Sequence, residues 1–339
     1  MGKKVVLSGY YGADNFGDEA ILNTLVNRLK KNNAEIVVLS SNPDKTMLTH
    51  KKLRAINKFS YFNVIKEILS CDVLISGGGS LLQDVTSLKS LFYYLWVIFV
   101  AQLFGKSVII FAQGIGPIKN KLAQILTKKL LKNCKWVSVR DDKSLFLLRG
   151  WKIQVEKVCD PIYEIELPQH SPKNILGVQL RSFKTVSEKL LLTLASRIAV
   201  DFADKEIEIY SFQDSNDLEI CQHFESLLLS INSELKTSVI QGLNVKEIVN
   251  RMANLDYLIA MRFHAVLVAL KYGIKTLAIN YDYKVENLAN ESNIPSLSMS
   301  ANEDYGYMFK LLKNENRTKL LEYSNSKHFD WEKFDLLVQ

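Results

Sequence analysis

Hydrophobic positions along this chain follow two spacings, which alternate from one segment to the next. Short apolar runs bounded by polar or glycine residues predict strands, and stripes repeating every three or four positions predict amphipathic helices. The predicted strands cover residues 5–8, 36–39, 72–76, 107–112, 136–139, 155–159, 175–179, 207–212, 237–240, 256–260 and 276–280. The predicted helices cover residues 19–31, 61–69, 91–104, 122–131, 143–148, 187–200, 218–229, 245–253, 265–272 and 284–291. Regular alternation of the two favours parallel, doubly wound sheets.

The chain is too long, at 339 residues, for one ordinary hydrophobic core. Residues 164–174 contain two prolines and little apolar periodicity, which is typical of a linker. The alternation restarts after this segment. We therefore expect an α/β fold of two facing Rossmann-like domains at residues 1–165 and 174–325. Residues 326–339 are predicted to form a C-terminal helix that packs back.

Composition is that of an ordinary globular protein, with 47% hydrophobic and 23% charged residues. Lysine and arginine exceed aspartate and glutamate by 43 to 36, and this charge of +7 suits an anionic substrate or an acidic membrane surface. No basic helix is interleaved with aromatic residues, which argues against nucleic acid. The four cysteines are widely spaced without metal-ligand partners, which predicts a reducing cytoplasm and no metal.

The N-terminal apolar run is too short for a signal peptide, so a cytoplasmic location is expected. Residues 91–104 carry no charge but fall short of a bilayer span. They are predicted to form a buried helix. A homo-oligomer face and a shallow contact at the cytoplasmic membrane surface remain open for the same segment.

Cationic residues stand at three predicted strand ends of the second domain. Arg262 and His264 lie where the strand 256–260 gives way to a helix. The first turn of a helix favours negative charge, so cations there are explained if a phosphate or carboxylate binds. The alternatives are that Arg262 pairs with a surface carboxylate and that His264 is a core histidine. Arg181 and Lys284 follow two further strands, and the carboxyl ends of parallel strands share one edge.

The first strand runs into a glycine loop at residues 9–19. Its glycines do not have the dinucleotide-binding spacing, and no acidic residue follows the next strand, so the sequence does not support a dinucleotide site. Asp18 is either an N-cap or, with Asp14 or Asn15, a ligand for sugar hydroxyls that could accept a proton. A second loop holds glycines at 77–79 after a strand, which fits either close approach to a ligand or tight packing.

Several of these segments together resemble the polysaccharide pyruvyl transferase family, especially its bacterial cell-wall and exopolysaccharide branch. The matching motifs are GYYGADNFGDEAI at 9–21, SGGGSLLQD at 76–84, AQGIGP at 112–117, VRD at 139–141, DP at 160–161 and MRFHA at 261–265. The resemblance implies a glycosyltransferase-B-like fold. It also implies phosphoenolpyruvate as donor, a sugar diol as acceptor, in some cases lipid-linked, and a pyruvate ketal and phosphate as products. No metal or redox cofactor is needed for this chemistry.

The resemblance also suggests roles for individual residues. Donor binding is expected of Arg181, Arg262, His264 and Lys284, and acceptor binding of Gly12, Asn15, Asp18, Gly78, Gly79, Asp84 and Gln113. His264 is the expected acid beside Arg262, and Asp18 the expected base with Asp160 in reserve. Ser80 stands where many relatives have glycine, a departure that bears on acceptor fit.

Two other functions remain open at this point. A nucleotide-sugar glycosyltransferase of the same architecture would use Arg262 and Lys284 to hold a diphosphate. A non-catalytic sugar-phosphate binding protein would bind an acceptor without releasing phosphate. One architecture hosts many activities, so the fold does not separate these.

Overall fold

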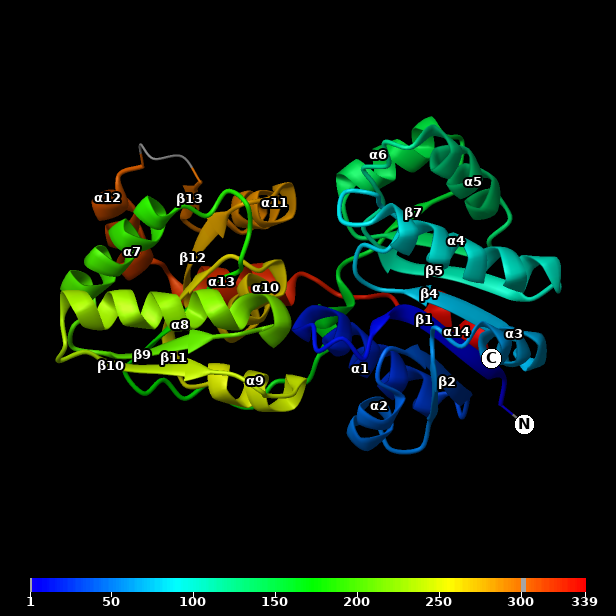
Figure 1. The fold of residues 1–339 in the computed structure, drawn as a ribbon, viewed down its shortest axis with the longest axis horizontal. Helices are drawn as coiled ribbons and strands as arrows, with labels where there is room; N and C mark the ends of the chain where they lie inside the picture. Colours follow the sequence, from blue (N-terminus) through cyan, green and yellow to red (C-terminus); the bar gives the residue numbers. More distant parts are fainter. Residues whose placement is uncertain (1, 300–302) are drawn as a thin grey trace. The chain divides into compact units, whose positions relative to one another are not determined.

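The computed structural model describes residues 2–299 and 303–339, which form two compact units. Unit 1 contains residues 1–165 and 328–339, and unit 2 contains residues 166–327. Each unit is one parallel sheet with helices between successive strands (Figure 1). The predicted fold class of two Rossmann-like domains is therefore confirmed. The unit boundary falls inside the predicted linker, after Ile165.

Unit 1 has a seven-stranded sheet in the order β3-β2-β1-β4-β5-β6-β7. Its elements are β1 (Lys4–Tyr11), α1 (Phe16–Lys31), β2 (Glu35–Ser40), α2 (Pro43–Thr49), β3 (Arg54–Asn57), α3 (Tyr61–Ser70), β4 (Val73–Gly77), α4 (Leu88–Leu103), β5 (Ser107–Gln113), α5 (Lys121–Lys132), β6 (Trp136–Val139), α6 (Asp142–Gly150), β7 (Glu156–Lys157), the 3-10 helix η1 (Pro161–Glu164) and the C-terminal α14 (Glu332–Val338).

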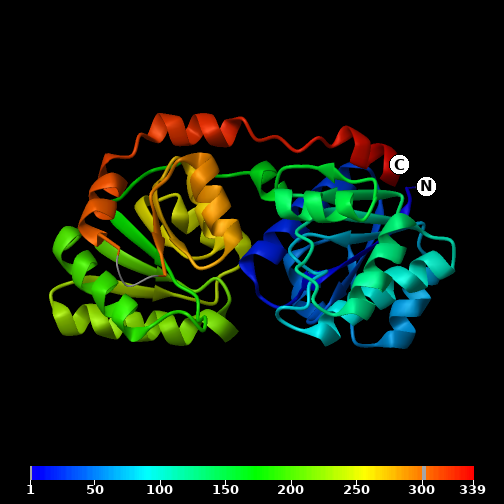
Figure 2. The same cartoon turned by 90° about the horizontal axis from the view of Figure 1, so that it is seen from above.

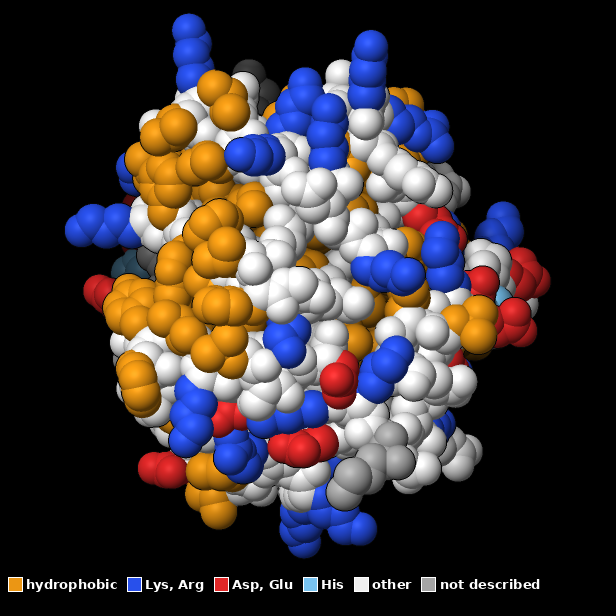
Figure 3. Space-filling view, turned by 90° about the vertical axis from the view of Figure 1, so that its right-hand side faces the viewer, with side chains coloured by type: hydrophobic (Ala, Val, Ile, Leu, Met, Phe, Trp, Pro, Cys, Tyr) orange, Lys and Arg blue, Asp and Glu red, His pale blue; other side chains and the backbone are white. Residues whose placement is uncertain are grey.

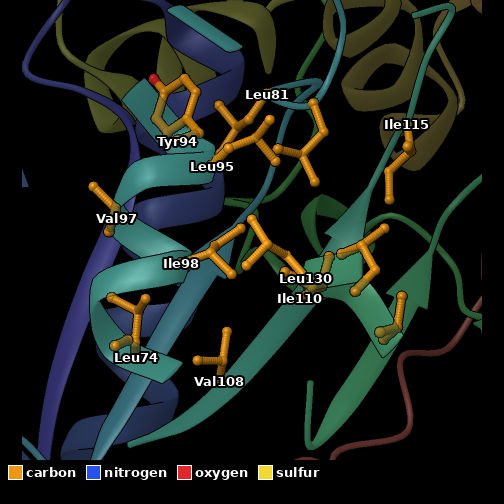
Figure 4. Close-up of a cluster of buried hydrophobic side chains, with 14 of the residues drawn as sticks. Leu74, Leu81, Tyr94, Leu95, Val97, Ile98, Val108, Ile110, Ile115 and Leu130 are labelled. Atoms are coloured by element: carbon orange, nitrogen blue, oxygen red, sulfur yellow. The ribbon is translucent and has the colours of Figure 1, made fainter. Parts of the chain in front are cut away.

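The two faces of this sheet are covered by different helices, because successive side chains of a strand point to opposite faces. Leu74, Val108 and Ile110 pack with α4 residues such as Ile98 in one apolar cluster (Figure 4). The next side chain, Phe111, points to the other face and contacts Phe334 of α14 with ring centroids 5.2 Å apart. Figure 2 shows α14 in red on one side of this sheet and α4 in cyan on the other.

Unit 2 has a six-stranded sheet in the order β10-β9-β8-β11-β12-β13. Its elements are β8 (Ile175–Gln179), α7 (Glu188–Asp201), β9 (Glu206–Tyr210), α8 (Asp214–Ile231), β10 (Lys236–Ile240), α9 (Val245–Met252), β11 (Leu255–Ala260), α10 (Phe263–Tyr272), β12 (Lys275–Asn280), α11 (Tyr283–Ser292), β13 (Ser296–Ser298), α12 (Tyr305–Asn314) and α13 (Arg317–Asn325).

Some elements differ from the sequence prediction. Helix α1 begins at Phe16 rather than near residue 19, and α2, β3 and β13 were not predicted at all. β3 and β13 contain two and one apolar residues, which leaves no apolar run to recognise. Helix α2 did carry a start signal, since Asn42 is its N-cap and Pro43 follows. The sequence also predicts a helical tail from Asn302 onward, and Asn302 itself lies outside the described residues.

Each sheet has a switch point, a pair of neighbouring strands from which the chain adds further strands first on one side and then on the other. In unit 2 it lies between β8 and β11, and in unit 1 between β1 and β4. Ligands of doubly wound sheets bind outside the carboxyl ends of the strands at such a switch point. The predicted site residues are distributed over these two edges. None of the described helices is both long and apolar enough to cross a membrane.

Candidate active site

Three of the predicted donor residues follow adjacent strands of unit 2. Arg181 comes after β8, Arg262 directly after β11, and Lys284 after β12, and β11 pairs in parallel with both β8 and β12. The carboxyl ends of these strands therefore bring the three side chains to one edge, on either side of the switch point. This neighbourhood was predicted from the alternation of strands and helices, and the sheet order agrees with it.

Arg262 is the N-cap of α10 and is only 8% exposed. Its Nε and Nη2 donate to the two carboxylate oxygens of Asp217 at 2.7 Å each, and Asp217 is fully buried in α8. The backbone N–H of Arg262 donates to Gln179 Oε1 at 2.7 Å. The sequence predicted that this guanidinium fork points at a bound anion. In the structure its Nε–Nη2 edge faces Asp217, which is a buried carboxylate and not the surface one considered as the alternative.

His264 stands in the first turn of α10, which contains no acidic residue. The imidazole is half-buried and meets the ring of Phe263 edge to face, with centroids 5.1 Å apart. No side chain caps this helix, because its N-cap position is occupied by Arg262. The helix N-terminus thus presents its positive dipole end next to an imidazole. This arrangement suits an anionic ligand that needs a proton donor.

Arg181 has a different environment from Arg262. Its Nη1 donates to the hydroxyl of Tyr281 at 2.9 Å, and its guanidinium lies 5.6 Å from the centre of that ring. Its Nε is buried and has no hydrogen-bond partner. Within the described part of the chain no carboxylate pairs with Arg181. Arg181 therefore carries a positive charge that none of the described carboxylates neutralises.

Tyr281 connects the cationic residues of this edge. Burial raises the pKa of its hydroxyl, Asp282 raises it further, and the charges of Arg181 and Arg262 both oppose the rise. Both arginines thus act on one phenol at this edge. Asp282 caps α11 by accepting from the N–H groups of Lys284 and Val285 at 3.0 Å each. Lys284 is half-buried in the first turn of that helix.

At the switch point of unit 1 the predicted glycines pack against α1. Gly78 and Gly79 have φ of +69° and +67°, a region that favours glycine. A Cβ atom on Gly79 would lie 2.3 Å from Asp18 Oδ1, and one on Gly78 would lie 2.4 Å from the side chain of Ile21. The carboxylate of Asp18 therefore lies directly over the second glycine loop. Tight packing, one of the two readings of this loop, accounts for both glycines.

The first turn of α1 is organised by Asn15. Its Oδ1 accepts from the N–H groups of Gly17 at 3.1 Å and Asp18 at 3.4 Å, so Asn15 is the N-cap. The reading of Asp18 as the N-cap is therefore wrong, and its carboxylate does not have that structural role. Gly12, at φ +72°, packs against Ser40 and donates its N–H to Glu19 Oε1 at 2.7 Å.

Asp84 and Gln113, predicted to contact the acceptor, brace loops in this structure. Asp84 Oδ2 accepts from the N–H groups of Lys119 and Asn120 at 2.7 Å each. Gln113 is fully buried and donates its side-chain amide to Ser76 O at 2.8 Å and Ser76 Oγ at 2.9 Å. These contacts hold the ends of β4 and β5 and the start of α5.

Asp160, the reserve base, is also engaged. One carboxylate oxygen pairs with the buried guanidinium of Arg140, and the other accepts from the N–H of Ile162 at 3.0 Å. Asp160 is 4% exposed. These contacts favour a structural role in which Asp160 starts η1 and neutralises Arg140.

The family model for polysaccharide pyruvyl transferases matches residues 15–283, well over half of the chain. The chain belongs to the polysaccharide pyruvyl transferase family. The family suggested by the sequence motifs is therefore confirmed, and the protein is a transferase by membership. A search of curated proteins gave no match.

Solved structures of similar fold share little sequence with this pyruvyl transferase. HepE from Anabaena, in complex with UDP and glucose, has a TM-score of 0.63 at 10% identity, covering 98% of this chain and 97% of its own. A UDP-N-acetylglucosamine 2-epimerase from Listeria monocytogenes has a TM-score of 0.66 at 11% identity, covering 95% and 91%. A glycosyltransferase from Rickettsia africae has a TM-score of 0.61 at 16% identity, covering 96% and 93%. These similarities show the two-domain glycosyltransferase-B-like fold and no more.

Two titratable residues of this pyruvyl transferase near Asp18 were missed by the sequence analysis. Burial raises the pKa of Glu19 to about 7, with the charges of Asp18 and Asp14 adding to the effect and the N–H groups of Gly12 and Ala13 opposing it. Lys58 is buried just after β3, where desolvation lowers its pKa while Asp18 and Glu19 oppose the change. Its ammonium lies 5.1 Å from the centre of the Tyr10 ring.

Sequence signals for these two residues were weak. Glu19 follows Asp18 directly and looked like an ordinary first-turn acid. Lys58 follows the unpredicted strand β3, so its position at the carboxyl edge of the sheet could not be inferred. Together with Asp18 they make a compact group of two carboxylates and one ammonium at the edge where the acceptor residues were expected. Within residues 2–299 and 303–339 there is no group of three or more His, Cys, Asp or Glu side chains that could hold a metal ion.

Proposed function

We propose that this pyruvyl transferase moves the pyruvyl group of phosphoenolpyruvate to a sugar diol of a cell-surface glycan or its lipid-linked precursor. The products are a cyclic pyruvate ketal and free phosphate. The observation that supports this most is Arg181, a half-buried guanidinium without a carboxylate partner at the unit 2 switch point. Phosphoenolpyruvate carries a carboxylate and a phosphate, and a planar guanidinium binds either with paired hydrogen bonds.

In this proposal Arg181 makes the principal charge-assisted contact with the donor. Nη1 already donates to Tyr281 and the buried Nε has no partner, so the guanidinium keeps donors that the described residues do not use. Lys284 and the N-terminus of α10 add positive potential. Arg262 keeps its Nε–Nη2 edge on Asp217, and this carboxylate neutralises its charge. We therefore assign Arg262 mainly to positioning the first turn of α10, with His264 on it.

His264 is the proposed acid. A proton moves to the methylene carbon of phosphoenolpyruvate, which leaves an electron-poor centre at C2. The first sugar hydroxyl adds to C2 and loses its proton, and the C2–O bond to phosphate breaks. The second hydroxyl then adds to C2, loses its proton and closes the ketal ring. One proton is taken up and two are released, of which the leaving phosphate carries one at neutral pH.

Asp18 remains the proposed base that accepts a hydroxyl proton. It is not consumed by capping the helix, and Gly79 gives its carboxylate space. Asp160 is a poorer candidate because Arg140 and the N–H of Ile162 already engage both of its oxygens. Glu19 and Lys58 adjoin Asp18 and would set the local charge.

The test measures phosphate release from phosphoenolpyruvate with lipid-linked and nitrophenyl hexose acceptors. Arg181→Met should raise the KM for phosphoenolpyruvate roughly 10- to 150-fold, the value of a hydrogen bond to a charged group. His264→Ala should lower kcat by about two to four orders of magnitude while phosphoenolpyruvate still binds. Arg149→Met is the matched control, because Arg149 is exposed.

Three results would count against the proposal. An unchanged KM in folded Arg181→Met would remove Arg181 from the donor site. If phosphoenolpyruvate neither bound nor released phosphate with any acceptor, while uridine diphosphate raised the melting temperature, the nucleotide-sugar glycosyltransferase would be favoured. Binding of an acceptor without release of phosphate from any donor would favour the non-catalytic protein.

A further inference from the structure

Three helices on one face of unit 1 expose large apolar side chains next to each other. Helices α3 and α4 pack together, and so do α4 and α5. Tyr61 of α3 meets Trp96 of α4 edge to face at 5.1 Å. Among the exposed apolar side chains of these helices are Tyr61, Phe62, Phe99, Leu103, Leu122 and Ile125. We call this surface the apolar face. The buried side of α4 belongs to the core, so the predicted buried helix 91–104 has an exposed stripe as well.

The charge of the apolar face has one sign. The only acidic residue in α3, α4 and α5 is Glu67, which is buried and pairs with Lys4 at 2.9 Å and with Arg54. The lysines of the same helices are all exposed: Lys66, Lys89, Lys121, Lys128, Lys129 and Lys132. Figure 3, seen from the right-hand side of Figure 1, shows hydrophobic side chains gathered in one area with lysine and arginine side chains around it.

We propose that the apolar face docks unit 1 on an anionic phospholipid bilayer. Aromatic and leucine side chains beside lysines are what an interfacial, non-spanning membrane contact requires. Lysines near such a surface are attracted to anionic head groups. A second copy of the chain is the poorer occupant, because a two-fold interface would bring this lysine-rich surface against itself. The apolar side chains would be covered but the like charges would repel.

The position of the face also fits a lipid-linked acceptor, so this inference extends the proposed function. Helix α3 begins three residues after Lys58, at the carboxyl edge of the sheet. The exposed Phe59, Tyr61 and Phe62 therefore lie at the same edge as Asp18 and Glu19. A sugar carried on a membrane lipid would reach the proposed acceptor residues without leaving the bilayer surface.

The test is flotation of the full-length protein with vesicles of phosphatidylcholine, with and without phosphatidylglycerol. Wild type should float with the anionic vesicles only. Phe62→Ser/Phe99→Ser/Ile125→Ser and Lys128→Glu/Lys129→Glu/Lys132→Glu should each reduce the partition at least about tenfold. The controls are Val200→Ser/Leu336→Ser and Lys236→Glu/Lys246→Glu/Lys310→Glu, which change exposed residues elsewhere. They should float like the wild type.

Phosphate release with a soluble nitrophenyl acceptor separates this inference from the proposed function. Every variant here should keep that activity, since none touches a proposed site residue. Wild type that fails to float with anionic vesicles overturns the membrane contact, whether or not it releases phosphate. A homodimer in light scattering that only the triple serine variant abolishes would also overturn it, and would assign the face to a second copy.

Discussion

Arg181 and Arg262 stand at neighbouring strand ends, yet their surroundings give them different roles. Arg262 has a buried carboxylate against two of its nitrogens, and its backbone is held by Gln179. Arg181 has a phenol and an unsatisfied Nε. The sequence placed both at the same edge, because each follows a short apolar run. It could not show that Asp217, far along the chain in α8, neutralises only one of them.

The buried ion pair between Arg262 and Asp217 is expected to contribute to the stability of the fold. Arg262→Ala leaves Asp217 fully buried without its partner, and the loss of one member of a buried pair costs about 3 to 5 kcal/mol. Urea unfolding should report this loss. Arg262→Leu/Asp217→Leu should recover most of the loss, because no isolated charge remains. If Arg262→Ala unfolded like the wild type, its guanidinium would have to be held in another way.

The raised pKa of Glu19 predicts how the stability of the protein depends on pH. Its folded pKa of about 7 lies above the unfolded value near 4.5, so the folded state prefers the protonated form. The stability that this group contributes is fully present below about pH 4.5 and is lost as the pH rises to about 7. The rise from 4.5 to about 7 corresponds to a loss of about 3 kcal/mol at most, at roughly 1.4 kcal/mol per pKa unit.

Glu19→Gln keeps an oxygen for the N–H of Gly12 and removes the titration. We expect the variant to be more stable than the wild type at pH 8 and to show a flatter dependence of unfolding free energy between pH 5 and 8. Glu35→Gln, at an exposed glutamate, is the control and should not change the slope. A wild-type slope retained in Glu19→Gln would mean that another group titrates.

Elements were predicted well where many residues report the same periodicity. Helices α4, α5 and α7 and strands β5 and β8 were expected within a few residues of their observed ends. The errors are two short edge strands, the short helix α2 and the start of α1. β3 and β13 contain only two and one apolar residues, and α1 starts earlier because Asn15 caps it through its side chain. Because β3 was not predicted, the place of Lys58 at the end of a strand could not be inferred. Lys58 was therefore left out of the candidate site.

The contact between the second glycine loop and α1 can be tested with matched glycines. Gly79 and Gly105 both have φ of +67°, but an added Cβ would be 2.3 Å from Asp18 Oδ1 at Gly79 and would have nothing within 4 Å at Gly105. Alanine at either site pays the left-handed backbone cost of about 1 to 2 kcal/mol. Gly79→Ala should lose a further 1 to 3 kcal/mol, roughly, from overpacking against α1.

Activity separates packing from chemistry at this loop. Because the extra methyl group displaces the carboxylate of Asp18, Gly79→Ala should also impair acceptor-dependent phosphate release, whereas Gly105→Ala should not. Thermal melts and phosphate release of the two purified variants give the comparison. Equal behaviour of the two alanines in both assays would show that the loop and the helix do not constrain each other.

At the scale of the whole molecule, the chain leaves unit 1 after residue 165 and returns to it at residue 328. The returning segment is held by specific contacts. Asp335 accepts from Arg28 Nε at 2.9 Å and Asn32 Nδ2 at 2.8 Å, and the N–H of Phe329 donates to Glu164 Oε1 at 2.9 Å. Phe329 and Phe334 pack on Phe111 of β5. Unit 1 is therefore complete only after the last residues of the chain have been added.

This arrangement predicts a stability change confined to one unit. Phe334 is fully buried against Phe111, whereas Leu336 of the same helix is 77% exposed. Phe334→Ala should cost unit 1 about 3 to 5 kcal/mol, the loss typical of removing a buried aromatic side chain. Hydrogen exchange should accelerate in β1 and β5 and stay at the wild-type rate in β8 and β11. Leu336→Ala should change neither unit. Equal acceleration in both sheets would instead mean that the two units unfold together, and that the returning helix stabilises the whole chain rather than the sheet it covers.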